Sequence, residues 1–559
     1  MAPNRTTDHF GSARYATPDE LANEGVLSFQ VVTPAKPLGP RTNRVEYLNQ
    51  QPGNSAFILG RLASPVDLLG DIRIFYEDSG VLAGFTSLIK TLSGRRDVNW
   101  SGNILGYRGD GHIISFAPTR SGKGIGLVIP NLLHYPGSVI CVDPKGENYA
   151  ITHRYRRDVL GQQVICLDPF RVRDLNTISD AINPLDGLFD PRAKQETYLE
   201  SHPELGDDVA NIADAMILRT KEEKDPHWND KARMLIKGLI LGTVFGLGPT
   251  RRRHLGEVRR MLAQPAKEFE KMLRDWEENR KTLASGMVSR VASEIRAMGP
   301  DEMSSVISTA LRHTEFLDSP RALESLGAAP PDSGQESYDI RNLKSRGGVS
   351  IYIILPPHHM ARYARLIRLW ISSAMAAMTR TEAKPADGVP ILFMLDEMAQ
   401  LGRMEPLITA VSLLAGYGMT LWMVWQDLAQ IKAIYENEWP SFLANAKVQQ
   451  YFGINDHETA KMVSEMLGEE TVINETSSIN DGKSSQGGFF SSTPATKTTG
   501  SSLSRSEAAR HLLKPDEIRR LNREAMLMFV QGCSPILAQR LAYFQDGEFR
   551  GRYDRNPYR

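Results

Sequence analysis

The sequence predicts an α/β fold whose strand-forming part is interrupted by an all-helical segment. Short apolar runs that end at turn signals are typical of buried parallel strands, and three of them occur early, at 112–117, 138–143 and 163–168. Similar runs resume much later in the chain, at 349–355, 390–396, 420–426, 448–453 and 526–532. Between residues 187 and 335 the pattern is helical, with apolar residues at helical spacing and strongly charged stretches.

The length and composition are typical of a multidomain soluble protein. The 559 residues suggest two or three domains. Lys+Arg and Asp+Glu both number 66, so the net charge is zero. This argues against a protein that coats nucleic acid along its whole surface, whereas a local basic channel is compatible with it. No apolar run approaches the ~18–20 residues that span a bilayer, and we expect the chain as given to be cytoplasmic.

Changes in composition divide the chain into four parts. Residues 1–55 form a partly irregular N-terminal extension, and 56–186 hold the first part of the α/β domain. Residues 187–335 are the predicted all-α insertion, and 336–559 complete the α/β domain. Within this last part, 474–506 is rich in Ser, Thr and Gly with few apolar residues, which predicts a flexible loop.

A loop with two glycines joins the strand at 112–117 to a helix-like segment. Its sequence is A-P-T-R-S-G-K-G, residues 117–124. Strand, loop and helix is the context of a phosphate-binding P-loop, in which backbone N–H groups and the helix N-terminus bind phosphate oxygens. Lys123 would supply the charge for the β- and γ-phosphates. The residues expected to bind the nucleotide are Pro118, Thr119, Arg120, Ser121, Gly122, Lys123, Gly124 and Ile125.

The loop departs from the general pattern G-x-x-x-x-G-K-[ST] at two positions. Ala117 replaces the first glycine, and Gly124 replaces the hydroxyl residue that normally binds Mg²⁺. Taken alone, the loop could therefore be an ordinary glycine-rich turn between a strand and a helix. If Mg²⁺ binds here, Thr119, Ser121 or water could replace the missing hydroxyl.

A second half of the site is predicted far downstream. The apolar strand P-I-L-F-M-L ends in Asp396 and Glu397. Asp396 is expected to hold the Mg²⁺ shell, and Glu397 to orient and deprotonate the attacking water. Together with Lys123, these carboxylates predict nucleotide hydrolysis. Gln426 closes the next strand, where it either senses the γ-phosphate or caps a helix.

Seven strings together resemble the coupling proteins of type IV secretion systems, the TraG-like conjugative DNA-transfer ATPases. The strings, in chain order, are G-S-A-R-Y-A-T (11–17), I-L-G-R-L (58–62), A-P-T-R-S-G-K-G-I-G-L-V-I-P-N-L-L (117–133), V-D-P-K-G-E-N (142–148), D-P-H-W-N-D-K-A (225–232), L-D-E-M-A-Q-L-G-R (395–403) and Y-F-G-I-N-D-H-E-T-A (451–460). A P-loop that ends in G-K-G is usual in this family, so Gly124 departs from the general motif but not from the family's.

The resemblance implies a RecA-like P-loop ATPase domain with an inserted all-α domain, and ATP and Mg²⁺ as cofactors. It also implies a homo-hexamer that drives single-stranded DNA, with relaxase or effector proteins, into a secretion channel. Other secretion ATPases and inner-membrane components would be its further partners. Family members usually carry transmembrane helices before the G-S-A-R segment, which here begins at residue 11. Association with the inner membrane through partners or a missing anchor is therefore expected.

Other charged residues are weaker candidates. Asp143, Lys145 and Glu147 follow the second strand and are expected to border the nucleotide and couple it to a neighbouring subunit, although a plain charged turn is an alternative. Arg403 is a candidate for a charge that reaches the site across a subunit boundary. The basic cluster H-R-Y-R-R at 153–157 could contact DNA phosphates or could be a solvated face.

Two other functions are compatible with these residues. The first is a ring-forming DNA translocase of the same ATPase clade that acts outside secretion. The second is a substrate-docking scaffold with weak ATPase activity, which the imperfect P-loop would permit.

Overall fold

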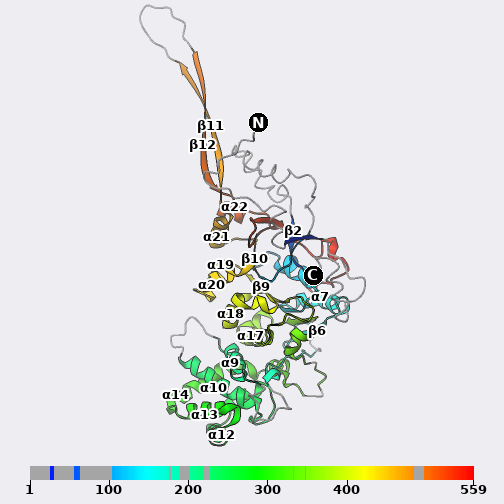
Figure 1. Cartoon of the computed structure of the whole chain (residues 1–559), viewed down its shortest axis with the longest axis vertical. Coiled ribbons are helices and arrows are strands. Elements are labelled where there is room, and N and C mark those ends of the chain that lie inside the picture. The colour runs from blue at the N-terminus through cyan, green and yellow to red at the C-terminus, as the bar shows by residue number, and fades with distance from the viewer. Residues whose placement is uncertain are drawn as a thin grey trace, which may run out of the picture.

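A large mixed β-sheet lies at the centre of the molecule, with a helical region at one end and a long hairpin at the other (Figure 1). The computed structural model describes residues 26–29, 56–62, 104–174, 178–188, 202–218, 227–330, 333–335, 337–346, 348–483 and 497–558. Within these ranges, no helix has the length and apolar character needed to cross a membrane. The predicted α/β fold class is confirmed.

The sheet has twelve strands in the described residues, in the order β1-β3-β2-β14-β13-β10-β4-β9-β8-β5-β7-β6. The seven from β10 to β6 are parallel, and the other five join antiparallel at one side. The strands are β1 (Val26–Phe29), β2 (Phe57–Leu62), β3 (Ile104–Tyr107), β4 (His112–Phe116), β5 (Val139–Val142), β6 (Gln163–Leu167), β7 (Val349–Ile353), β8 (Ile391–Leu395), β9 (Met419–Trp425), β10 (Ala446–Phe452), β13 (Ala525–Val530) and β14 (Ile536–Gln539).

All eight predicted strands are present, and the four that the sequence did not indicate are short and lie on the antiparallel side. One of these, β1, belongs to the N-terminal extension 1–55 and pairs with β3. Apart from β1, the extension lies outside the described residues.

Both faces of the sheet are buried, as expected for parallel strands with continuous apolar runs. Along β4, Ile113 enters one apolar core, and Ile114 and Phe116 enter the other. The helices of the α/β domain are α6 (Ile129–His134), α7 (Glu147–Asp158), α16 (Leu343–Arg346), α17 (Pro357–Thr379), α18 (Glu405–Leu413), α19 (Leu428–Ile434), α20 (Trp439–Ala444), α21 (His457–Leu467) and α22 (Pro515–Arg519).

Within residues 187–335 the described residues form helices and no strand, and a single bridge joins Ala181 and Ser337 just outside these bounds. We call this segment the helical insertion. Its helices are α9 (Leu205–Met216), α10 (His227–Val244), α11 (Gly256–Leu262), α12 (Ala266–Asn279), α13 (Met287–Arg296), α14 (Pro300–Thr314) and α15 (Pro320–Leu323). In α12, Phe269, Leu273 and Trp276 recur at helical spacing and are buried, so this helix packs by one apolar stripe.

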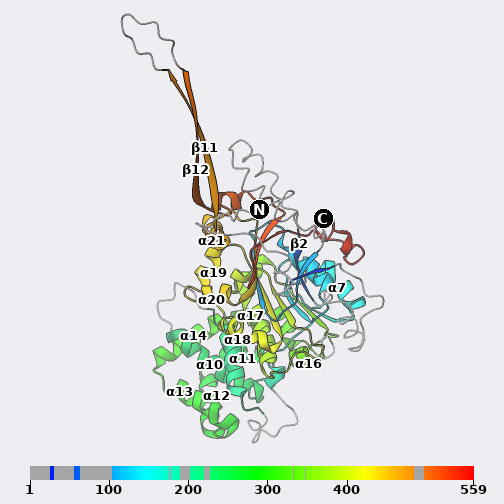
Figure 2. The same ribbon diagram turned by 45° about the horizontal axis from the view of Figure 1, so that its top comes forward.

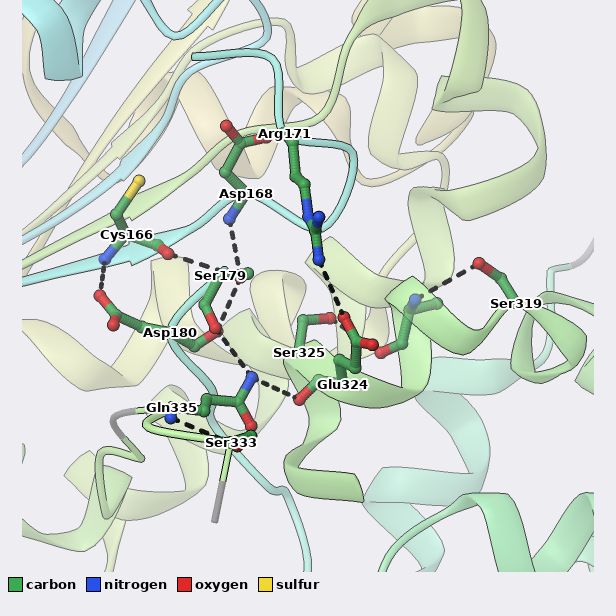
Figure 3. A network of polar contacts seen from close by, with 11 residues as sticks. Cys166, Asp168, Arg171, Ser179, Asp180, Ser319, Glu324, Ser325, Ser333 and Gln335 are labelled. Atoms are coloured by element: carbon green, nitrogen blue, oxygen red, sulfur yellow. Dashed lines mark hydrogen bonds and ion pairs between the residues drawn. The ribbon is translucent and has the colours of Figure 1, made fainter. Parts of the chain in front are cut away.

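The two ends of the helical insertion are tied together beside β6 (Figure 3). The Asp180 carboxylate accepts the Cys166 N–H at 2.7 Å, and the Ser179 hydroxyl accepts the Asp168 N–H at 3.0 Å. On the exit side, Gln335 Nε2 donates to the carbonyls of Ser179 and Glu324 at 2.8 and 2.9 Å. The chain therefore leaves and re-enters the sheet at neighbouring points.

The prediction of a flexible loop at 474–506 needs correction. Its described residues belong to a two-stranded antiparallel hairpin of β11 (Glu469–Lys483) and β12 (Lys497–His511), which projects away from the sheet (Figure 2). Composition was misleading here because threonine, which recurs in this segment, favours strands. In addition, pairing over fifteen residues satisfies the backbone without an apolar core. Residues 484–496 lie outside the described part.

Candidate active site

The predicted site has three parts, which are the P-loop, the carboxylates of Asp396 and Glu397, and Gln426. All three lie at one edge of the sheet. β4, β9 and β8 are adjacent parallel strands. The P-loop follows β4, Gln426 follows β9, and Asp396 and Glu397 follow β8. Ligands of open α/β sheets bind outside the carboxyl ends of the strands. A cleft of about 590 Å³ lies at this edge.

The cleft brings together most of the residues predicted from sequence. Its lining includes Thr119, Arg120, Gly122, Lys123, Gly124, Ile125, Asp143, Lys145, Glu147, Asp396 and Glu397. Pro118 and Ser121 belong to the same loop but do not line the cleft, and Gln426 reaches it only through Glu397. The cleft walls that the sequence reasoning missed are Pro144, Asn148, Pro357, Met360 and Gln400. Gln400 lies in the quoted string L-D-E-M-A-Q, whereas Pro357 and Met360, at the start of α17, have no signal in the sequence.

The loop has the sharp backbone of a phosphate cradle. Arg120 and Gly122 have positive φ angles of 65° and 88°, a conformation that glycine adopts without strain. The Ser121 N–H donates to the Pro118 carbonyl at 3.1 Å, and the Gly126 N–H to the Gly122 carbonyl at 2.9 Å. The helical run then starts at Gly124, so its first N–H groups lie at the cleft.

Lys123 is held between the two carboxylates. Its Nζ lies 2.9 Å from Asp396 Oδ1 and 2.5 Å from Glu397 Oε1. All three side chains are largely buried, so this is a compact group with one positive and two negative charges. A nucleotide phosphate would compete with the carboxylates for the same ammonium.

Burial and charge act in opposite directions on these groups. Burial would lower the pKa of Lys123, but the two carboxylates outweigh it and the pKa is raised. Burial raises the pKa of Asp396, and Lys123 offsets only part of this effect. For Glu397, burial is outweighed by the Lys123 charge and by hydrogen bonds, so its pKa is lowered. The less buried Glu397 is therefore the carboxylate that stays ionised and can act as a base.

Glu397 is fixed by its own backbone and by Gln426. Its φ and ψ of 60° and 46° lie in the left-handed region, which costs a non-glycine residue free energy and is typical of functional positions. Gln426 Nε2 donates to Glu397 Oε2 at 3.0 Å. The N-cap of α19 is Asp427, so the capping role considered for Gln426 falls to its neighbour.

The turn after β5 forms the opposite wall. Asp143 is buried and accepts the Tyr149 N–H at 2.8 Å. Burial raises its pKa to about 7, against the opposing effect of two backbone hydrogen bonds. The Tyr558 hydroxyl donates to the Lys145 carbonyl at 2.6 Å, and Asn556 donates to the Glu147 carboxylate. The C-terminal residues therefore hold this turn in place.

The carboxylates at this edge suit Mg²⁺ only when a nucleotide supplies further oxygen ligands. Mg²⁺ is usually bound by one or two carboxylates together with substrate phosphates, and Asp396 and Glu397 lie beside the loop. No three His, Cys, Asp or Glu side chains gather as a metal-binding group in the part of the chain that the structure describes. Ser121 Oγ is buried and has no hydrogen-bond partner among the residues that the structure describes, but it does not line the cleft, whereas Thr119 does.

Two basic candidates lie away from the cleft. Arg403 pairs with Glu405 at 2.7 Å and with both oxygens of Glu438 at 2.9 and 3.0 Å. Within the basic cluster 153–157, Arg156 is buried and donates to the backbone carbonyls of three residues and to one hydroxyl. Arg156 is therefore a structural residue and cannot contact DNA.

Several known proteins resemble this chain over most of its length. A family model described as "Type IV secretory system Conjugative DNA transfer" matches residues 80–556. The "Conjugal transfer protein TraG" of Escherichia coli is 26% identical over 493 residues, which cover 82% of this chain and 72% of the relative. "Protein VirD4" of Rhizobium radiobacter is 27% identical over 458 residues, covering 82% and 60%.

A solved structure described as "Plasmid coupling protein TrwB in complex with ADP and Mg2+" has the same fold. Its TM-score is 0.53 at 14% identity, and the match covers 79% of this chain and 88% of that one. At this identity the likeness shows the fold alone. The family model, however, spans most of the chain. The chain therefore belongs to the type IV secretory system conjugative DNA transfer family, to which its sequence strings pointed.

Proposed function

We propose that this chain is an ATP-hydrolysing DNA translocase that links relaxase–DNA or effector substrates to a type IV secretion channel. One observation carries the enzymatic part: Lys123, Asp396, Glu397 and Gln426 come from three adjacent strand ends and are joined by direct contacts. The family supports the secretion part, and the ADP and Mg²⁺ in TrwB support the choice of ligands.

The geometry supports a role for each residue in this proposal. The loop 118–125 binds the phosphates through its N–H groups, and Lys123 compensates the charge that develops on the transferred phosphoryl group. Glu397 takes the proton of the attacking water, and Gln426 keeps the carboxylate of Glu397 turned toward the cleft. Mg²⁺, when bound with the nucleotide beside Asp396, would supply further charge compensation.

The remaining proposals concern assembly. We propose an active homo-hexamer that works on single-stranded DNA with relaxase or effector proteins, other secretion ATPases and inner-membrane components, and that lies at the inner membrane through partners or an anchor. The helical insertion, with the boundaries 187–335, would face the substrates. Lys145 would couple the nucleotide to the next subunit, and Arg403 would reach a neighbouring site after leaving Glu405 and Glu438.

The test is ATP hydrolysis by the purified chain with and without single-stranded DNA. Glu397→Gln should retain ATP binding and lose at least ~10²-fold in turnover, because a positioned general base contributes ~10²–10⁴-fold. Lys145→Ala should lower stimulation by DNA or assembly while leaving binding intact. If DNA gave no stimulation and Glu397→Gln hydrolysed ATP at the parental rate, the translocase proposal would fail and a docking scaffold would be favoured.

A further inference from the structure

A second, smaller pocket adjoins the phosphate-binding loop. It has a volume of about 190 Å³, and its walls include Ile125, Glu524, Gln539, Arg540, Phe544 and Gln545. Ile125 also lines the 590 Å³ cleft, so both spaces border the end of the loop. Complete small-molecule sites usually measure ~300–1,000 Å³. The smaller pocket therefore has the size of a subsite that extends the cleft.

Arg540 lines the smaller pocket, and its side chain lies along the backbone of the loop at Gly122 and Gly126. A Cβ placed on Gly126 would lie 2.3 Å from Arg540 Cγ, and one on Gly122 would lie 2.3 Å from Arg540 Nη1. The side chain therefore needs glycine at both positions to pass. Its Nη1 donates to the Gly122 carbonyl at 3.4 Å.

The positive charge and the N–H groups of the Arg540 guanidinium are only partly matched by the residues around it. Its Nε is buried and has no hydrogen-bond partner among the described residues. Burial lowers the pKa of Arg540, and the charge of Glu524 opposes this only in part. A phosphate oxygen at the loop would supply the missing acceptor and the missing negative charge.

The far walls of the pocket combine an aromatic surface with hydrogen-bonding groups. The Phe544 ring is 41% exposed and stands edge-on to Tyr543, with centroids 5.3 Å apart. Gln539 Nε2 donates to Glu524 Oε2 at 2.8 Å, which leaves the amide oxygen of Gln539 as an acceptor. An aromatic face with amide and carboxylate groups around it suits a planar heterocycle and sugar hydroxyls.

We propose that this pocket binds the base and ribose of the nucleotide whose phosphates lie on loop 118–125, and that Arg540 contacts the phosphates between them. This inference rests on the proposed nucleotide site. It adds a nucleoside subsite built by residues 524–545, which follow the P-loop by some four hundred positions in the chain.

The experiment compares ATP with inorganic tripolyphosphate by titration calorimetry on the full chain. Tripolyphosphate carries the same phosphate chain without base or ribose. Phe544→Ala should weaken ATP binding about tenfold or more, because base–aromatic stacking is worth that much, and should leave tripolyphosphate binding unchanged. Phe544→Trp, which keeps an aromatic face, should restore ATP binding.

Arg540→Ala should weaken both ligands, and Arg540→Lys should recover part of the loss. Leu413→Ala is the matched control, because Leu413 is a 65% exposed apolar side chain outside both spaces. For the Phe544 variants, tripolyphosphate binding also reports that the protein is folded, and for the Arg540 variants the midpoint of urea unfolding does so. Equal effects of Phe544→Ala on ATP and tripolyphosphate, or no effect on either, would overturn the subsite. Failure of the parent to bind either ligand would instead overturn the nucleotide site itself.

Discussion

Lys123 Nζ lies 2.5 Å from Glu397 Oε1, so the lysine of the phosphate-binding loop is held by the carboxylate of the opposite strand end. A second contact, 2.9 Å long, joins the same nitrogen to Asp396. An ammonium has three N–H donors, so a phosphate oxygen of the proposed nucleotide could take the third donor of Lys123 or replace one of the carboxylates. Replacement of Glu397 would release its carboxylate to receive the proton of water.

Lys123→Ala should abolish nucleotide turnover and also destabilise the protein. The charge on the transferred phosphate would be uncompensated, and two neighbouring buried carboxylates would lose their cation. Removing one partner of a buried pair costs up to ~3–5 kcal/mol. Adding Glu397→Gln to this variant should return part of that stability, as measured by urea unfolding at pH 7.5.

Lys123→Arg keeps the charge and serves as the control for stability. Suppose that Lys123→Ala unfolded at the same urea concentration as the parent, and that adding Glu397→Gln gave no gain in stability. The contact between Lys123 and Glu397 would then not stabilise the fold.

Gln426→Ala should lower kcat about tenfold and leave the Kd of ATP nearly unchanged. The amide donates to Glu397 Oε2 at 3.0 Å, and this bond lowers the pKa of Glu397. Its loss should therefore raise that pKa and move the acid limb of the pH–rate profile to higher pH. A lower kcat with an unmoved profile would show that Gln426 acts in another way.

Strand-end carboxylates and the lysine of the loop could be predicted from sequence because each follows a short, largely apolar strand. Parallel strands must bring their carboxyl ends to one edge, so Asp396 and Lys123 meet despite the helical insertion between them. The helical pattern of residues 187–335 could be recognised for a similar reason, since apolar residues such as Leu235, Leu239 and Ile240 recur at helical spacing.

The residues that escaped prediction depend on contacts distant in sequence. Arg540 contacts the loop at Gly122, more than four hundred residues earlier, and a single arginine after a short strand carries no pattern. Arg156 looked like part of a charged face, yet its guanidinium is buried against carbonyls. The β11–β12 hairpin was missed because its stability comes from strand pairing and not from an apolar periodicity.

Asp143→Asn should remove a component of the pH dependence of stability. Burial raises the pKa of this carboxyl to about 7 in the folded chain, from the ordinary aspartate value of 3.8. The folded state thus binds the extra proton, and stability falls as the pH rises from about 4 to about 7, by about 1.4 kcal/mol per pH unit at most. Urea midpoints at pH 5 and pH 8 measure this slope.

The Asp143→Asn variant should show a smaller loss between these two pH values than the parent. Asp158→Asn, at the exposed C-terminal end of α7, controls for the loss of one negative charge. An unchanged slope in Asp143→Asn would mean that Asp143 has no raised pKa in solution.

His313→Gln tests the opposite pH dependence in the helical insertion. His313 is buried, and Arg365 Nη2 approaches its Nδ1 at 3.4 Å while its Nε2 lies 2.7 Å from Asn229 Oδ1. Because an arginine only donates, Nδ1 is the acceptor and Nε2–H donates to Asn229, so the ring is neutral. Burial and the nearby arginines lower its pKa to about 3. The unfolded chain therefore takes up the proton first, and stability falls as the pH drops below about 6.5.

Between pH 6.5 and pH 5, His313 should lower the free energy of unfolding by about 2 kcal/mol. Glutamine at this position can still donate to Asn229, and it should remove this loss. His227→Gln, an exposed histidine on α10, controls for the loss of an imidazole. Urea unfolding of the parent, His313→Gln and His227→Gln at pH 7 and pH 5 measures this loss of stability. If His313→Gln lost as much stability as the parent on acidification, the neutral buried imidazole would not be the acid-sensitive group of the helical insertion.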